Sequence, residues 1–222
     1  RKRTKVMVAC NWRFYPAIRK VRELLSDGAI GRPLSARIEG GSYLPGWHPW
    51  EDYRQGYSAR KDLGGGCLLD CIHEIDYSNW LFGDPREVVG LYGTMGGLEI
   101  DTEDVAALLI RYSSGTIVTV HLDYVQRPAH RSCRVIGSEG TIEWSLEDSR
   151  VRWFDPNAGD WTEWPVTDPN AVDASYVDEI AHFIDAVQQD DDNMSGLDEG
   201  LRAVNVVEAA RASQTNGRIV TL

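Results

Sequence analysis

Alternating apolar and polar side chains predict a run of β-strands through the middle of the chain. In residues 116–125, valine and leucine alternate with threonine, histidine and aspartate, which is the period of a strand with one buried face. The other segments with strand-like patterns are 34–43, 86–94, 104–112, 131–136, 141–146 and 150–154. Short turns containing glycine, serine or aspartate separate the later segments, so these segments predict a large, mainly antiparallel sheet.

Helical spacing of apolar residues marks four further segments. Residues 17–26 end at Asp27-Gly28, which is a helix-termination signal. The other three segments are 67–82, 173–188 and a stretch that starts at Ser195 or Gly196. In the last two, the residues expected to face the core are Tyr176, Ile180, Phe183, Ile184 and Val187, and then Leu197, Leu201, Val204, Val207 and Ala210. Helices placed around one long antiparallel sheet define an α+β fold.

The segment 104–112 is apolar on both of its faces, which predicts that the sheet is covered on both sides. Helices packed on one face supply half of that cover. We expect the other face of this open sheet to be available for oligomerisation. A second copy of the chain would then cover it and form a homodimer or homotetramer.

The composition excludes several classes of protein. The 23 basic and 34 acidic side chains give a net charge of −11, which argues against a nucleic-acid partner. No apolar run approaches the length of a membrane span, and the apolar stretch 6–10 is too short for a signal peptide. Four cysteines do not make a disulfide framework. We therefore expect a cytoplasmic protein.

The stretch Gly64–Asp76, with the sequence GGGCLLDCIHEID, concentrates the candidate chemistry. Its three glycines predict a tight entry to a helix and suit a close approach to a ligand. On a helix over 67–82, Asp70, His73 and Tyr77 share the face opposite the expected buried one. His73 can give or take a proton near neutral pH, and Asp70 is placed one turn earlier to orient it. A purely structural Asp–His pair is the alternative.

The preceding segment 44–63 has no clear period and combines aromatic rings with polar and cationic groups. It is either a plug over the core or a binding loop, in which rings form platforms for a sugar or a base. Its place before the glycine-opened helix favours binding. The residues expected on the substrate side are His48, Tyr53, Arg54, Tyr57 and, from the helix, Tyr77.

A metal site is an alternative use of the same residues. Its candidate ligands are His48, Asp70, His73 and Asp76. The helical period turns Asp76 well away from Asp70, which weakens this reading. We therefore predict no metal ligands, and a metal-dependent hydrolase is kept only as a third hypothesis.

The chain resembles the Gfo/Idh/MocA family, the group of glucose-fructose oxidoreductase and inositol dehydrogenase. The pattern GGG-x-L-x-D, H-x-x-D and WLFG stands here at Gly64–Asp70, His73–Asp76 and Trp80–Gly83. Three more segments are similar to the family and follow its order, namely Asn11–Phe14, Gly28–Pro33 and Gly137–Ile142. The step from Asp70 to His73 is three residues here, whereas many members of the family have four.

The resemblance implies the C-terminal part of a two-domain oxidoreductase whose N-terminal Rossmann domain, missing here, binds NAD or NADP. Residues 1–32 would be a remnant of the last Rossmann strand and its linking helix. Residues 33–222 would form the α+β domain for substrate binding and oligomerisation. Asn11 and Arg13 are then expected near the nicotinamide, and His73, tuned by Asp70, would take the hydroxyl proton.

The implied reaction is the reversible oxidation of a secondary alcohol in a sugar, inositol or nucleotide-linked sugar. The sequence has neither the family's Glu-Lys-Pro segment nor an evident nicotinamide pocket. The isolated chain is therefore expected to be inactive. The alternative function is a catalytically silent binding and oligomerisation module.

Overall fold

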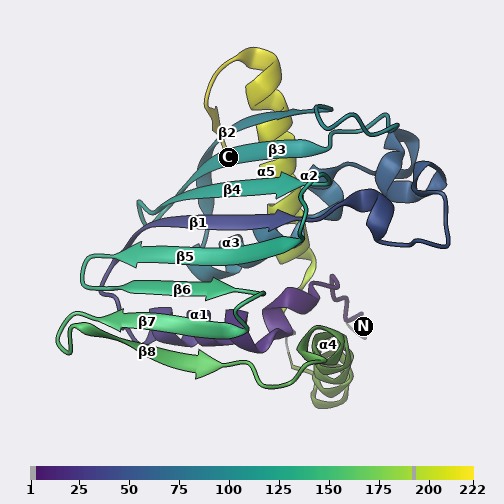
Figure 1. The fold of residues 1–222 in the computed structure, drawn as a ribbon. Helices are drawn as coiled ribbons and strands as arrows, with labels where there is room; N and C mark the ends of the chain where they lie inside the picture. The colour runs from purple at the N-terminus through teal and green to yellow at the C-terminus, as the bar shows by residue number, and fades with distance from the viewer. Residues whose placement is uncertain (1–3, 192–193) are drawn as a thin grey trace.

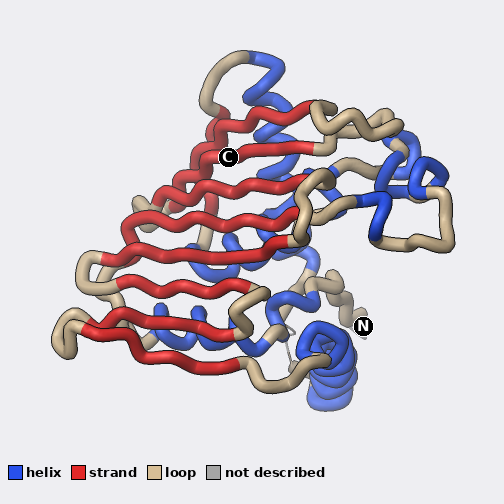
Figure 2. The backbone as a smooth tube through the Cα atoms, in the orientation of Figure 1, coloured by secondary structure: helices blue, strands red, loops and turns tan. Residues whose placement is uncertain are grey.

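The computed structural model describes residues 4–191 and 194–222, and its central element is a nine-stranded open sheet (Figures 1 and 2). The strand order is β8-β7-β6-β5-β1-β4-β3-β2-β9. The strands are β1 (Pro33–Gly41), β2 (Pro85–Gly93), β3 (Val105–Tyr112), β4 (Ile117–Asp123), β5 (His130–Gly137), β6 (Thr141–Ser145), β7 (Arg150–Asp155), β8 (Asp160–Pro165) and β9 (Val220–Thr221). The predicted α+β class and the mainly antiparallel sheet are confirmed.

Strands β1 and β4 form the parallel pair of this sheet, with Ser35 opposite Ile117 and Gly41 opposite Asp123. The other strand pairs of the described residues are antiparallel. Because β1 and β4 run in the same direction, the chain leaves both strands at the same edge of the sheet. There the segment after β1 joins the segment after β4, through a hydrogen bond from Leu44 N to Tyr124 O of 2.9 Å.

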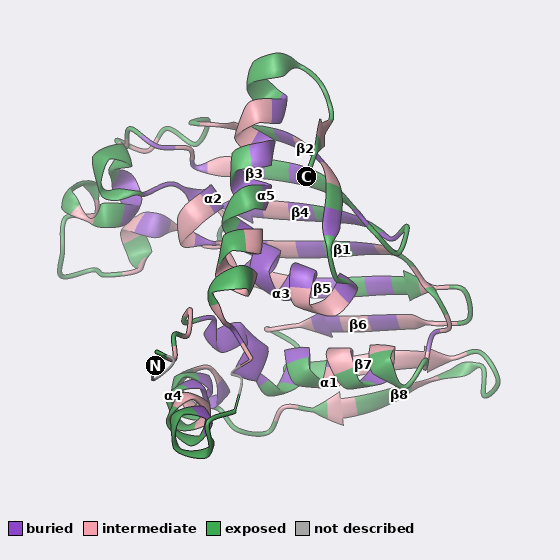
Figure 3. Ribbon diagram, turned by 180° about the vertical axis from the view of Figure 1, so that it is seen from behind, coloured by how far each residue is buried: buried purple, intermediate pink, exposed green. Residues whose placement is uncertain are grey.

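Helices α1 (Pro16–Ser26), α3 (His73–Phe82) and α5 (Leu197–Asn216) cover one face of the sheet (Figure 3). The core lies between them and the buried strand residues Ala36, Ile38, Ala106, Leu108, Ile110, Val118, Val120 and Leu122. Within the described chain the other face is uncovered, and Leu91 and Leu109 on it are 67% and 44% exposed. No helix of the described ranges is long and apolar enough to cross a membrane.

Helix α4 (Ala171–Gln189) turns the opposite way from the prediction. Its buried residues are Ala171, Ser175, Glu179 and Ala186, and it packs against the 3₁₀ turn η1 (Asn11–Phe14). Tyr176 and Ile180, which were expected to face the core, are 52% and 54% exposed, and Ile184 and Val187 are also exposed. The small and polar side of α4 is buried because η1 approaches closely there.

The predicted inward face of α5 is correct only in its second half. Val207 and Ala210 are buried as expected, whereas Leu197, Leu201 and Val204 are exposed. The N-terminal segment contacts these first turns of α5 at Gly200, but the side that carries Leu197, Leu201 and Val204 meets solvent.

The N-terminal segment also differs from the remnant of a Rossmann strand that the resemblance implies within residues 1–32. Residues 5–10 form no regular strand, because their backbone contacts the turn before α5, with a hydrogen bond from Val8 N to Ser195 O of 2.8 Å. A strand needs an extended neighbour with a free edge, and this segment has none among the described residues. The proposed boundary between 1–32 and 33–222 stays a prediction, and residues 1–3 lie outside the described residues.

Candidate functional site

The helix predicted over residues 67–82 is divided into two helices. Helix α2 spans Cys67–Asp70, and α3 begins at His73. Between them Cys71 has φ −93° and ψ 31°, which lies outside the α-helical region. Asp70 and His73 therefore belong to different helices, and the one-turn relationship expected for them is lost.

Two of the three glycines before α2, Gly65 and Gly66, pack closely against the protein itself, whereas a Cβ on Gly64 would meet no atom within 4 Å. Gly66 has φ +108°, a conformation that suits glycine, and a Cβ on it would lie 2.3 Å from Oε1 of Glu103. A Cβ on Gly65 would lie 2.1 Å from the carbonyl oxygen of Tyr57. The Glu103 carboxylate also accepts a hydrogen bond from the backbone N–H of Leu68 at 3.2 Å. The expected close approach of a ligand is therefore wrong for Gly65 and Gly66, because the Tyr57 backbone and the Glu103 side chain occupy those places.

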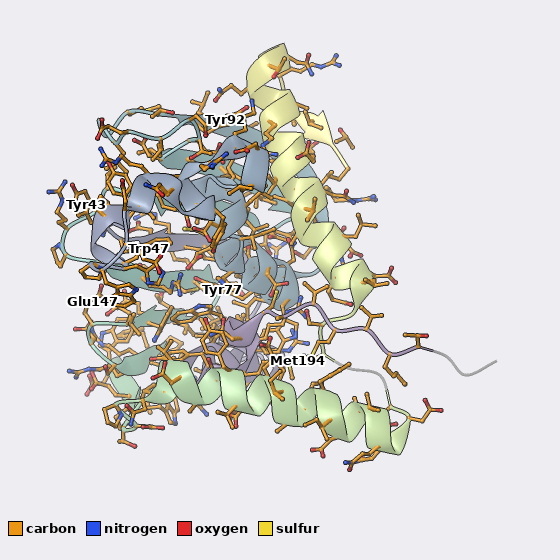
Figure 4. The ribbon with its side chains drawn as sticks, turned by 90° about the vertical axis from the view of Figure 1, so that its right-hand side faces the viewer. Tyr43, Trp47, Tyr77, Tyr92, Glu147 and Met194 are labelled. Atoms are coloured by element: carbon orange, nitrogen blue, oxygen red, sulfur yellow. The ribbon has the colours of Figure 1, made fainter. Side chains whose placement is uncertain are left out.

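A cavity of about 380 Å³ opens at the sheet edge where β1 ends and β5 begins. Figure 4 views the molecule toward this edge and labels Trp47, in the loop after β1, as one lining residue. The polar lining residues are Ser42, Asp70, His73, His130 and Arg131, and the aromatic ones are Trp12, Trp47, Tyr57 and Tyr176. Apolar walls with a few convergent polar groups are the usual form of a small-molecule site.

His73 lines this cavity and is its candidate proton acceptor. Its Nδ1 is buried without a hydrogen-bond partner among the described residues. Burial, and then the positive charge of Arg131, lower the pKa of His73 from 6.5 to about 4. The imidazole is therefore neutral near neutral pH. A neutral imidazole can take the proton of a bound hydroxyl group.

Asp70 is hydrogen-bonded to two tyrosines. The hydroxyl of Tyr57 donates to Oδ1 of Asp70, and the hydroxyl of Tyr124 donates to Oδ2 at 2.9 Å. Burial, followed by the Asp70 carboxylate, raises the pKa of Tyr57 to about 12, so this phenol stays neutral. No hydrogen bond joins Asp70 to His73 among the described residues. Asp70 instead holds Tyr57 in place as one wall of the cavity.

Of the residues predicted on the substrate side, Tyr57 lines the cavity. His48 lies on the exposed surface of its loop. Arg54 forms an ion pair with Glu99 at 2.9 Å, and the hydroxyl of Tyr53 accepts a hydrogen bond from the backbone N–H of Glu99 at 3.3 Å. Tyr53 and Arg54 thus bind the loop between β2 and β3, away from the cavity lining.

Tyr77 is fully buried in the core, so its predicted place on an open face is wrong. Helix α3, on which Figure 4 labels Tyr77, contacts β1, β4, α1, α5 and η1. A helix with neighbours on so many sides has no solvent face at its centre. The helical period identified one buried face correctly, including Leu68 and Ile75, but it did not show that the opposite face is buried too.

Asn11 and Arg13 are both engaged by other parts of the chain. Arg13 forms two hydrogen bonds with the Asp76 carboxylate, at 2.7 and 2.8 Å, and each of these side chains is 2% exposed. Nδ2 of Asn11 donates to the Ser175 hydroxyl at 2.9 Å. Both side chains are thus buried inside the described chain, and their role as cofactor contacts stays a prediction. The same ion pair withdraws Asp76 from the alternative metal site.

The sequence interpretation missed five of the residues that line the cavity, namely Trp12, Trp47, His130, Arg131 and Tyr176. Trp12 lies in a segment that resembles the family, and Trp47 lies in the aromatic loop, so both carried a signal. Arg131 opens a predicted strand, which by itself indicates no site. Tyr176 had been assigned to the core.

Comparison with known proteins gives a family match, and the matched residues include His73, Arg131 and other residues that line the cavity. The profile of the GFO/IDH/MocA C-terminal domain matches residues 18–143. The D-apiose dehydrogenase of Paraburkholderia graminis is 29% identical over 237 residues, which cover 98% of this chain and 59% of that relative. The chain therefore spans about three fifths of the length of this curated relative.

Solved structures show the same fold. An oxidoreductase from Agrobacterium radiobacter, in complex with NAD+, L-tartaric acid and magnesium, matches with a TM-score of 0.83 and 24% identity over 98% of this chain and 65% of that one. A levoglucosan dehydrogenase in complex with NADH and levoglucosan matches with a TM-score of 0.85 and 19% identity over 97% of this chain and 66% of that one. On the profile match, which covers more than half of its residues, the chain belongs to the GFO/IDH/MocA family.

Proposed function

We propose that this chain is the substrate-binding and oligomerisation part of an NAD(P)-dependent oxidoreductase that acts on a secondary alcohol of a sugar, inositol or related polyol. The observation that carries the proposal is a neutral His73 in a cavity with aromatic walls. The names of the relatives support it, since one is a D-apiose dehydrogenase and a similar structure holds NADH and levoglucosan.

In this reaction the alcohol carbon loses a hydride and its hydroxyl group loses a proton. NAD(P)+, when bound, supplies the hydride acceptor. His73 accepts the hydroxyl proton and returns it in the reverse direction. Trp47 in the cavity wall offers apolar surface to the C–H groups of a sugar, and the ring of Trp12 lies against Arg131.

We propose that a nucleotide-binding domain covers the exposed apolar side of α4. Tyr176 and Ile180 belong to this side, and Tyr176 also lines the cavity. The relatives are longer than this chain by an amount that fits a further domain. A domain seated there would reach the mouth of the cavity. Residues 33–222 would then hold the substrate, and residues 1–32 would form the junction.

The test uses a protein that contains both this chain and the proposed nucleotide-binding domain. It is offered D-apiose, levoglucosan and myo-inositol with NAD+ or NADP+, and the formation of reduced nicotinamide is measured by absorbance. The proposal expects turnover with at least one polyol and a loss of roughly 10²–10⁴-fold in His73→Ala. Equal turnover in that variant, or no turnover with any of the polyols, would contradict it. The chain alone is expected to bind no NADH and to be inactive.

We further propose that a second copy of the chain covers the open face of the sheet. The apolar part of this face carries Val89, Leu109, Ile117 and Ile219 around a small hollow. At the other end of the strand order, β6, β7 and β8 carry paired charges, such as Arg150 with Glu163. A two-fold contact of like surfaces can match both regions.

Sedimentation of wild type and of Leu109→Glu tests this contact. A dimer or tetramer that the variant disrupts supports the proposal, whereas a monomeric wild type contradicts it. Leu63→Glu is the control, because Leu63 is exposed on the loop before α2 and lies outside the sheet.

A further inference from the structure

We propose that Arg131 is a specificity-determining residue, whose guanidinium group donates hydrogen bonds to two neighbouring hydroxyl oxygens of a neutral polyol. This inference rests on the proposed function and names the part of the substrate that the cavity recognises. Arg131 lies at the start of β5 and lines the cavity together with His73. The inference is based on three features around Arg131: an ion pair, a ring contact and a balance of charge.

The first feature is an ion pair with Glu74, the residue that follows His73. The Glu74 side chain is fully buried, and its Oε1 lies 2.6 Å from Nε of Arg131. Its carboxylate reaches this place across Gly40, which is the strand partner of Arg131 on β1. A Cβ on Gly40 would lie 2.5 Å from Oε1 of Glu74. A glycine at this register therefore lets the carboxylate approach the arginine.

The second feature is a ring contact that fixes the plane of the guanidinium group. Cζ of Arg131 lies 3.8 Å from the ring centroid of Trp12. That ring is buried in an aromatic cluster, with centroid distances of 5.0 Å to Tyr15 and 6.0 Å to Trp144. Ring and ion pair together restrict a long side chain that would otherwise be free to rotate.

The orientation leaves donors for a ligand. Among the described residues, Nη1 and Nη2 of Arg131 make no hydrogen bond, and the side chain is 19% exposed. A planar guanidinium group presents paired N–H donors at a fixed spacing, which suits two oxygen atoms side by side. Two hydroxyl oxygens on adjacent carbons of a polyol meet this requirement.

The third feature is the balance of charge around the arginine. Glu74 offsets the charge of Arg131, and the cavity also holds the Asp70 carboxylate. The cavity thus has no surplus of positive charge that would favour an acidic substrate. Polyol hydroxyl groups accept hydrogen bonds without adding a charge, so a neutral polyol fits better than a sugar acid.

The first experiment measures kcat and KM of the two-domain protein with D-apiose and levoglucosan. Arg131→Gln should raise KM roughly 10- to 100-fold, which is the range for a lost hydrogen bond from a charged donor. Arg131→Lys should restore part of this loss. Arg19→Gln is the matched control, because Arg19 is also an arginine over an aromatic ring, that of the buried Phe14, but its side chain is exposed and lies outside the cavity lining. A folded Arg131→Gln protein with the KM of the wild type would overturn the inference.

A second experiment removes the balancing charge. Glu74→Gln keeps the size of the side chain but leaves Arg131 with an unpaired positive charge. The variant should then prefer an acid more strongly than the wild type does. The ratio of the KM for the neutral polyol to the inhibition constant of L-tartrate should rise roughly 10-fold. An unchanged preference in a folded variant would count against the charge argument.

Failure of the inference can be separated from failure of the proposed function. If the wild-type protein oxidises a polyol and Arg131→Gln does so with unchanged KM, the function stands and the role of Arg131 falls. If no polyol is oxidised, calorimetry with the same polyols still tests Arg131. Binding that is lost in Arg131→Gln supports the inference, and the absence of binding overturns it.

Discussion

Asp70 accepts a hydrogen bond of 2.9 Å from the hydroxyl of Tyr124. Tyr124 is fully buried and follows β4, and Asp70 ends α2. The bond therefore connects the short helix to the sheet edge where the cavity opens. The second oxygen of Asp70 accepts the hydroxyl of Tyr57. One carboxylate thus sets the position of a wall of the cavity relative to the sheet.

Replacing Asp70 should cost both stability and substrate affinity. Asp70→Ala leaves the buried Tyr124 hydroxyl without its acceptor, which should lower the free energy of unfolding by about 1–3 kcal/mol. It also releases Tyr57, so KM should rise. Urea denaturation measures the first effect. Tyr124→Phe removes one bond and leaves no polar atom unpaired on the tyrosine side, so it should cost less than Asp70→Ala. An equal or larger cost would contradict this account.

The neutral His73 should make the protein less stable in acid. In the unfolded chain its imidazole takes a proton near pH 6.5, whereas the folded chain resists protonation until the pKa of about 4. As the pH falls through this window, the unfolded state binds the proton first, so the free energy of unfolding falls by roughly 3 kcal/mol. His73→Gln cannot titrate and should lack this part of the pH dependence. The free energy of unfolding of both proteins is measured by urea denaturation between pH 4 and pH 8. The same pH dependence in both proteins would contradict this role of His73.

Gly40→Ala should displace Glu74 from Arg131. The added Cβ would lie 2.5 Å from the buried Glu74 carboxylate, so that side chain or the strand has to move. We expect a loss of about 1–3 kcal/mol in the free energy of unfolding, together with a raised KM. Gly46→Ala is the control, because a Cβ there meets no atom within 4 Å. Equal midpoints of thermal unfolding for the two variants would show that the close contact of Gly40 with Glu74 does not contribute to stability.

The Arg13–Asp76 pair should be important for folding. Arg13→Met leaves the Asp76 carboxylate buried without its partner, and such a loss typically costs about 3–5 kcal/mol. The double variant Arg13→Met with Asp76→Leu should recover part of this loss, since no unpaired charge remains. Denaturation of the single and double variants measures the coupling. An Arg13→Met protein as stable as the wild type would contradict the assignment.

The strands were predictable because their two faces differ in environment. Val118 and Val120 meet the helices, whereas Thr119 and His121 lie on the open face of β4. The alternation of apolar and polar residues along the strand reflects this difference. The same reasoning failed for Tyr77, because a helix buried on all sides has no polar face for a period to reveal. It also failed for α4, whose apolar residues lie away from the described core.

The cavity was predictable only in part. His73 and Tyr57 carry the residue types of a site within a recognisable stretch of sequence. Arg131 belongs to the site through contacts with Trp12 and Glu74. These residues come from three elements that are distant in the chain, so no local pattern reports their meeting. The break between α2 and α3 at Cys71 was not predictable either, because the helical spacing of apolar residues continues through it.

We expect the parallel pairing of β1 with β4 to set when the cavity can form during folding. The β2–β3 hairpin needs only local contacts, and β4 can add to it directly. Strand β1 joins β4 only after a long loop has been closed, and that closure is entropically costly. Gly40, Gly41 and Ser42 reach the cavity by this step. The chain is therefore expected to acquire most of its secondary structure before it can bind a ligand.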